Sequence, residues 1–184
     1  MPRYFPIERY FMKKKFSIRL ADAGDIPLIH SMADIAFRHT YVDILSSGQT
    51  DYMMDMMYSE SVIASEMKAG QVYHIGMVDG APAAYTEIEP QPGAKFHLQK
   101  IYVLPEYQGL GLGSFMFDEA VEYISKVCAT PCVMELNVNR DNSKALRFYG
   151  HKGMKKVSQG DFDIGGGFFM NDFIMGLGIN GGQL

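Results

Sequence analysis

A run of closely spaced glycines at residues 108–114 has the clearest chemical meaning in this sequence. It reads Gln-Gly-Leu-Gly-Leu-Gly-Ser. Glycine adopts backbone conformations that other residues avoid, and it leaves no side chain between the backbone and a ligand. A strand pattern precedes the run and a helical pattern follows it. Because the first amides of a helix lack partners and carry partial positive charge, the segment predicts an anion site.

The glycine spacing narrows the choice of anion. The run lacks the Gly-Lys-Ser/Thr ending that places a lysine and a hydroxyl on a nucleoside triphosphate. The pattern Gly109-x-Gly111-x-Gly113 also differs from the G-x-G-x-x-G spacing of dinucleotide sites, and the acidic residue expected about 20 positions later is missing. Neither of these two phosphate-binding loops fits, and a glycine-rich connection without a ligand stays open on this segment alone.

Two segments resemble the signatures of the GNAT N-acetyltransferase superfamily. The glycine run is similar to the family's Gln/Arg-x-x-Gly-x-Gly/Ala signature, with Gln108, Gly111 and Gly113 in register. Residues 136–154 resemble the second signature, in which the matching positions are Asn142, Ala145, Phe148, Tyr149 and Gly153. Met154 replaces the usual Phe or Tyr and keeps an apolar anchor. The resemblance implies an α/β (α+β) fold: one GNAT-like domain with a mixed, mostly antiparallel sheet, flanking helices and splayed central strands.

The resemblance also implies the ligand and its binding residues. Acetyl-CoA is the expected cosubstrate, no metal is expected, and the turn would grip the pyrophosphate of CoA. The expected CoA-binding residues are Ile101, Tyr102, Val103, Gln108, Gly109, Leu110, Gly111, Leu112, Gly113, Ser114, Asn142 and Phe148. Asn142 equally fits a plain helix N-cap. Tyr149 would lie near the sulfur as general acid, since a phenol with a pKa near 10 is protonated at neutral pH. A tyrosine packed at the core edge is the alternative.

The expected reaction is direct attack of a primary amine on the thioester. An alkylammonium has a pKa near 10.4, so freeing its lone pair at neutral pH costs about 4 kcal/mol. A backbone N–H near Val103, where we expect a bulge, would polarise the carbonyl. No carboxylate occupies residues 96–101, so Glu87 is the candidate base. Glu89, His97 and bulk solvent are the alternatives.

The acceptor is less well specified. The Met-rich residues 52–58 could line an adaptable pocket or pack an amphipathic helix. Residues 37–41 and 161–175 resemble the bacterial polyamine-acetyltransferase-like branch. The acceptor is therefore expected to be a polyamine, another small amine or a protein N-terminus. Two other function classes stay open: a CoA-binding sensor or regulatory module with weak catalysis, and a nucleotide-phosphate module.

Periodicity predicts the elements that position these residues. Alternating patterns predict strands at 15–20, 71–78, 81–88, 95–103, 132–138, 155–158 and 168–177. Asp79-Gly80 is a strong hairpin signal. Helical spacing predicts helices from about residue 26 to 40, over 49–69 with a break near Ser59, from the glycine run to about 127, and over about 142–152. Prolines 90 and 92 are expected to break the chain, and residues 161–167 to separate the last two strands.

Composition sets the broad class. The chain has 184 residues, 47% hydrophobic content and a net charge of −4, which suits one globular domain and argues against nucleic-acid binding. The expected organisation is an extension at 1–11, the acyl-CoA N-acyltransferase domain at 12–178, and a flexible tail at 179–184. Two cysteines, no signal-peptide pattern and no long apolar run predict a cytoplasmic protein away from membranes. Dimers are common among the proteins it resembles, so a homodimer is an open expectation.

Overall fold

A mixed sheet forms the frame of the protein, and the computed structural model describes it over residues 14–184. In that range seven strands pair in the order β1-β2-β3-β4-β5-β7-β6, and only β4 and β5 run parallel. The strands are β1 Phe16–Leu20, β2 Val72–Val78, β3 Ala81–Gln91, β4 Lys95–Val103, β5 Cys132–Asn139, β6 Lys155–Gly165 and β7 Phe168–Ile179. The predicted fold class is confirmed. The extension at 1–11 and the domain start at Met12 lie outside the described residues.

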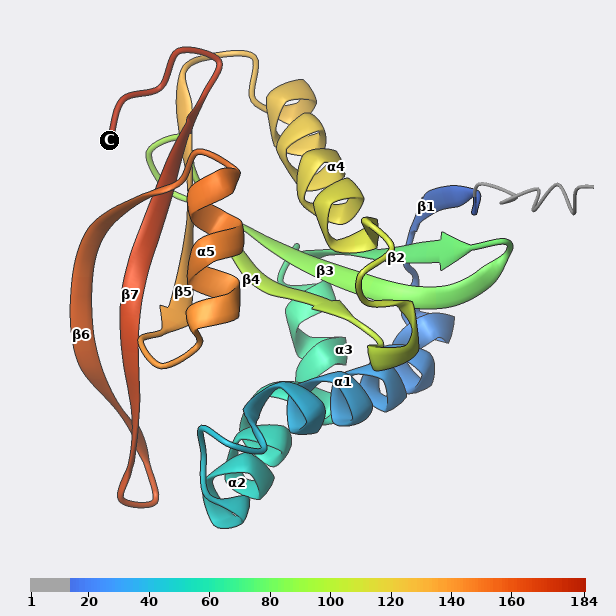
Figure 1. Cartoon of the computed structure of the whole chain (residues 1–184). Helices are drawn as coiled ribbons and strands as arrows, with labels where there is room; N and C mark the ends of the chain where they lie inside the picture. The colour runs from blue at the N-terminus through green and yellow to red at the C-terminus, as the bar shows by residue number, and fades with distance from the viewer. Residues whose placement is uncertain (1–13) are drawn as a thin grey trace, which may run out of the picture.

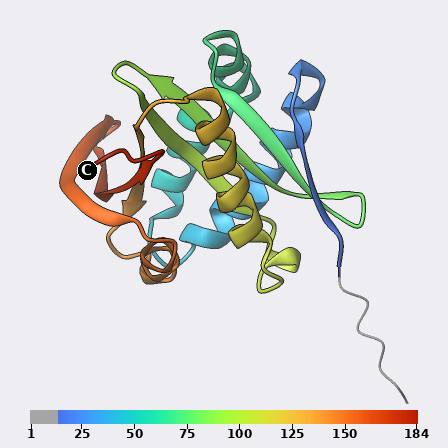
Figure 2. The ribbon, with the colours of Figure 1, turned by 90° about the horizontal axis from the view of Figure 1, so that it is seen from above.

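Helices cover both faces of the sheet (Figure 1, Figure 2). One face carries α4 and α5, and the other carries α1, α2 and α3, and separate clusters of buried hydrophobic residues form on the two faces. The helices are α1 Ile26–Tyr41, α2 Ser47–Tyr58, α3 Glu60–Lys68, α4 Leu112–Val127 and α5 Ser143–His151, with short 3-10 turns at Ala23–Asp25 and Pro105–Tyr107. No helix within residues 14–184 is long and apolar enough to cross a bilayer.

Local signals in the sequence explain several boundaries. The Ser46 side chain accepts a hydrogen bond from the Gln49 amide and caps the start of α2. Ser59 is extended, with φ −61° and ψ 151°, so the predicted break separates α2 from α3. Asp79 and Gly80 both have positive φ, at 50° and 87°, as a two-residue hairpin turn of this twist requires.

The central strands part soon after they pair. β4 and β5 share a parallel register only from Lys95–Val133 to His97–Glu135. Beyond these residues β4 stays paired with β3, and β5 stays paired with β7. The two strands therefore diverge toward their C-terminal ends, as Figure 1 shows. The splay implied by the family resemblance is confirmed, and it opens the sheet between its two faces.

The irregularity in β4 lies upstream of the place expected from the sequence. The register shifts between Glu87–Lys100 and Ile88–Leu98, which leaves Gln99 as the extra residue. Val103, where the bulge was expected, pairs regularly with Ala84. Because a bulge resets the alternation of a strand, Leu98 and Ile101 pack with the α4–α5 core, and Tyr102 packs with the α1–α3 core.

Two further boundaries differ from the sequence prediction. β3 continues through Pro90, which pairs with Phe96 at the end of the hairpin. β6 runs to Gly165, so most of the predicted 161–167 connection is strand. Its side chains are mostly exposed, which removes the alternation that predicts a strand. The C-terminal segment contacts the domain, since an added Cβ at Gly182 would lie 1.9 Å from the Cys132 carbonyl oxygen.

Candidate active site

The glycine run forms a tight turn between β4 and α4. Gly109 and Gly111 have φ of 76° and 89°, and Gly111 is the N-cap of α4. No side chain caps this helix start. An added Cβ at Gly109 would meet nothing within 4 Å, so the turn needs glycine for its backbone conformation and leaves open space before it. Unpartnered amides that face open space can bind an anion.

A cavity of about 400 Å³ runs from this turn into the gap between β4 and β5. Most of the residues expected to bind CoA line it: Ile101, Tyr102, Val103, Gln108, Gly109, Gly111, Gly113, Ser114, Asn142 and Phe148. Two others do not. The Leu110 side chain is 41% exposed to solvent, and Leu112 is 1% exposed within the core. The structure therefore brings the turn and the second signature segment together on one cavity, which we call the thioester cavity after the ligand that the family resemblance implies.

Tyr149 reaches this cavity from α5. Its ring packs on Phe117 and Phe148, with centroid distances of 6.2 and 5.3 Å. Burial, with a smaller contribution from Tyr41, raises the pKa of the phenol above its usual value. The hydroxyl thus stays protonated at neutral pH and can donate a hydrogen bond or a proton to a group in the cavity.

Two polar residues at the start of α5 complete the cavity at the turn. Asn142 Oδ1 accepts a hydrogen bond from the Ala145 amide at 3.1 Å, so Asn142 is the N-cap of α5. Its amide N–H₂ group is not used in that bond, and the residue lines the cavity. Lys144 Nζ donates to Gln108 Oε1 at 2.8 Å, and Gln108 Nε2 donates to the Val103 carbonyl at 3.2 Å. This chain of bonds brings a cation to the glycine turn.

A second cavity of about 290 Å³ adjoins the first from the side of α1 and α2. The two share Tyr41, Gln99, Tyr102 and Asn137, so they meet where β4 and β5 part. We call the second the acceptor cavity, after the amine acceptor that the family resemblance implies. The rest of its wall is aromatic, Met-rich or polar and comprises Phe37, Leu45, Gln49, Met53, Met57, Tyr58, Gln91, His97, Asn139, Met170 and Asp172.

Burial shifts the pKa values of the carboxylate and the imidazole in the wall of the acceptor cavity. Asp172 is 3% exposed, and burial raises the pKa of its carboxyl, while the Asn137 hydrogen bond at 3.2 Å and the charge of Arg140 oppose this. Burial lowers the pKa of His97, so its imidazole is neutral at pH 7. Glu89 and His97 are the alternatives to Glu87 as general base. Of these two, His97 lines the acceptor cavity.

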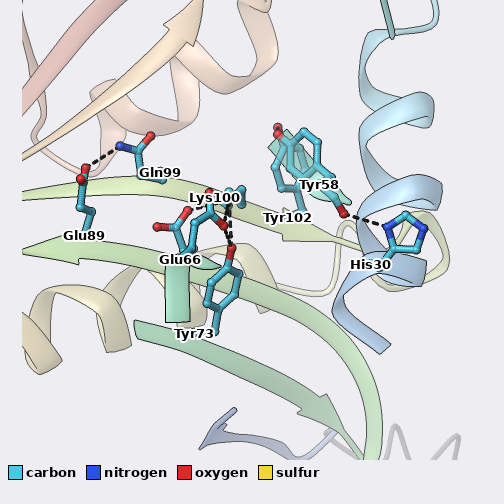
Figure 3. A network of polar contacts seen from close by, with 9 residues as sticks. His30, Tyr58, Glu66, Tyr73, Glu89, Gln99, Lys100 and Tyr102 are labelled. Carbon is cyan, nitrogen blue, oxygen red and sulfur yellow. Dashed lines mark hydrogen bonds and ion pairs between the residues drawn. The ribbon is translucent and has the colours of Figure 1, made fainter. Parts of the chain in front are cut away.

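Glu87 lies outside both cavities. It is fully buried, and its Oε2 is 2.9 Å from Lys100 Nζ, which is itself only 2% exposed. Lys100 also donates to both Glu66 oxygens, at 2.8 and 2.7 Å, and to the Tyr73 hydroxyl at 2.9 Å (Figure 3). Burial raises the pKa of Glu87 to about 7. The structure does not bring this carboxylate to a place where a bound amine could reach it.

Glu89 is also engaged elsewhere. Its Oε2 accepts a hydrogen bond from Gln91 at 2.9 Å. It also accepts one from Gln99 at 2.8 Å (Figure 3). The Gln99 bond holds the side chain of the bulged residue at the boundary between the two cavities. Within residues 14–184, no group of three or more His, Cys, Asp or Glu residues is placed to hold a metal ion.

Comparison with known proteins agrees with this geometry. Residues 35–154 match the family described as the Acetyltransferase (GNAT) family. The chain belongs to the GNAT family. The matched region begins within α1 and ends after α5, so it contains the glycine turn, the diverging strands and Tyr149. The match also includes the part of α1 from residue 35 onward, which the sequence motifs do not cover.

Individual relatives show how far the likeness extends. An uncharacterized N-acetyltransferase of Archaeoglobus fulgidus is 33% identical over 63 residues, which are 34% of this chain and 42% of the relative. The PaiA N-acetyltransferase of Thermoplasma acidophilum, solved in complex with coenzyme A, aligns with a TM-score of 0.73 and 22% identity over 88% of this chain and 98% of that one. The spermidine/spermine N-acetyltransferase SpeG of Vibrio cholerae aligns with a TM-score of 0.65 and 17% identity, over 89% of this chain and 93% of SpeG. These two structures share the fold.

The sequence motifs do not identify several residues of the two cavities. Lys144, Gln99 and Asn137 are among them, and Asp172 falls only within a pattern that resembles polyamine enzymes. Gln99 could not be identified from the sequence because its place depends on the bulge, and the bulge depends on how β4 pairs with β3. Asn137 and Asn139 are two residues apart on β5, and Met170 and Asp172 are two residues apart on β7. Because residues two apart lie on the same face of a strand, both members of each pair reach the acceptor cavity. That spacing was the available signal.

Proposed function

We propose that this protein transfers the acetyl group of acetyl-CoA to a primary amine by direct attack. The thioester cavity takes the CoA moiety, with the pyrophosphate on the free amides of the turn and the Lys144 ammonium beside it. The acceptor cavity takes the amine. The observation that supports this best is that the two cavities share four wall residues between the parted strands, so two ligands can meet there.

The chain's own residues supply the chemistry in this proposal. Backbone amides exposed where β4 leaves β5 polarise the thioester carbonyl. The amine attacks the carbonyl carbon, the C–N bond forms as the C–S bond breaks, and Tyr149 donates a proton toward the departing sulfur. One proton of the ammonium leaves before the attack. A second leaves the nitrogen as the amide forms, so one proton is released to solvent overall and one is retained on the thiol.

The amine class fits the walls of the acceptor cavity. Aromatic and Met side chains can cover an alkyl chain, and aromatic faces attract an ammonium group. The fold of SpeG, whose name states spermidine and spermine, supports a polyamine as one member of this class. Other small alkylamines and protein N-termini satisfy the same chemistry.

Calorimetry and a thiol-release assay test the proposal. We expect acetyl-CoA to bind with micromolar affinity, ATP and NAD to give no comparable heat, and at least one amine of an alkylamine and N-terminal peptide panel to release free CoA. Binding of CoA without turnover of any amine would favour the sensor or regulatory module. Absence of heat with CoA at millimolar concentration would refute both functions.

A further inference from the structure

The acceptor cavity contains a buried carboxylate that forms no ion pair with any residue of the described range 14–184. Asp172 is 3% exposed, and within residues 14–184 its side-chain hydrogen bond comes from the neutral amide of Asn137. The neighbouring Arg140 guanidinium is bonded instead to Asp161 on β6. A buried carboxylate without a cation is costly, since desolvation of the charge is not repaid. The protein keeps such a group beside an open cavity.

The position of Asp172 links it to the thioester cavity. It sits on β7 opposite Asn139 of β5, and its partner Asn137 lines both cavities. Tyr41 also lines both, and Asp172 is among the charges that act on it. Asp172 therefore lies beside the junction where the two ligands would meet.

The surroundings of Asp172 suit an alkylammonium better than a neutral or anionic ligand. On the described wall, the basic side chain is His97, which is neutral at pH 7. Aromatic rings cluster on the side of α1: Phe37 packs on Tyr41 at 4.6 Å and on Tyr58 at 4.9 Å between centroids. Met53, Met57 and Met170 supply flexible apolar surface for the carbon chain. A single negative group in such walls selects a compact cation with an apolar stem.

We infer that Asp172 binds the ammonium group that is to be acetylated and positions it at the junction of the two cavities. This inference rests on the proposed function and gives its acceptor a chemical class: a primary alkylammonium with an apolar chain. The substrate supplies the positively charged partner for the buried Asp172 carboxylate. A ligand ammonium placed there completes an ion pair, and its nitrogen then lies next to the cavity that would hold the thioester.

Binding and turnover with monoamine probes test this inference. n-Butylamine and the neutral 1-butanol have the same chain length, and each is titrated into the full-length protein saturated with CoA. We expect the wild type to bind butylamine at least tenfold more tightly than butanol. In Asp172→Asn, which keeps the shape and the acceptor for Asn137, this preference should vanish while the Kd for CoA stays within twofold. In the acetyl-CoA assay, kcat/KM for butylamine should fall about 100-fold.

Two further variants complete the design. Asp163→Asn makes the same charge change on the same hairpin, at an exposed residue whose bond to the Gly165 amide an asparagine can keep, and it should behave as the wild type. Asp172→Ser removes the charge with a smaller side chain and replaces the asparagine variant if that variant does not fold. The thermal midpoint should not fall in Asp172→Asn, because a buried charge is removed.

The outcomes separate this inference from the proposed function. If butylamine binds Asp172→Asn as tightly as the wild type, or if the wild type does not prefer it over butanol, the inference is wrong. A variant that loses only the turnover of diamines, and keeps that of butylamine, also overturns it, since Asp172 would then hold a distant ammonium. If binding depends on Asp172 but no amine releases CoA from the wild type, Asp172 binds an ammonium group without any transfer reaction, and the proposed function fails.

Discussion

Removal of one hydroxyl group tests the proposed chemistry most directly. Tyr149→Phe deletes the phenolic oxygen and keeps the ring between Phe117 and Phe148. Within residues 14–184, the interactions recorded for this side chain are ring contacts and the influence of Tyr41. The substitution therefore breaks no bond of the resting protein, and stability should change by less than about 1 kcal/mol.

The expected kinetic effect follows from what the hydroxyl does in the cavity. A positioned general acid contributes about 10²–10⁴-fold to a rate, so kcat should fall at least about 100-fold, or about 3 kcal/mol in activation free energy. The Kd for CoA should stay within about threefold, because the hydroxyl acts on the leaving sulfur and not on the pyrophosphate. Thiol release at saturating acetyl-CoA measures the first quantity and calorimetry the second. An unchanged kcat, or a parallel loss of CoA affinity, would remove Tyr149 from the acid role.

Three other substitutions probe separate parts of the site. Gly111→Ala places a Cβ at φ 89°, which costs roughly 1–2 kcal/mol, and should lower both the thermal midpoint and CoA affinity, by differential scanning and by calorimetry. Lys144→Met loses the bond to Gln108 and a cation at the turn, so the Kd for CoA should rise about tenfold at low salt and less at 0.5 M salt. Glu87→Gln should keep kcat within about twofold in the thiol-release assay. Because the pKa of Glu87 is about 7 in the folded protein and near 4.5 when unfolded, the native state holds more protons between these values. Wild-type unfolding free energy should therefore fall as pH rises from about 5 to 8, and urea titrations should show a smaller fall in this variant.

The sequence predicts the backbone frame well because its signals are local. The Asp79-Gly80 turn, the break at Ser59 and the start of α4 each depend on a few adjacent residues, and the structure confirms them. β6 shows the opposite case. It is an edge strand held by its pairing with β7, and its side chains are mostly exposed. With one partner and no buried face, it carries no alternation to detect.

The site is predictable only where it is encoded in contiguous residues. The glycine turn and the α5 segment were found because each is a short motif. The bulge at Gln99 depends on how β4 pairs with β3, and it changes which face each neighbouring side chain occupies. Glu87 looked available on an alternating strand, yet its face of the sheet is covered and Lys100 neutralises it there. Burial and pairing across strands are long-range facts that spacing does not contain.

The divergence of β4 from β5 also has a consequence for inhibitor design. The two cavities share four wall residues where the strands part, and the rest of each wall is made of different residues. Kinetics in which either substrate can bind first are compatible with this layout. A conjugate in which an alkylamine is joined through a short acyl linker to the CoA sulfur would pass between β4 and β5 and occupy both the thioester cavity and the acceptor cavity. Because the entropy of association is lost only once, it should bind far more tightly than CoA alone.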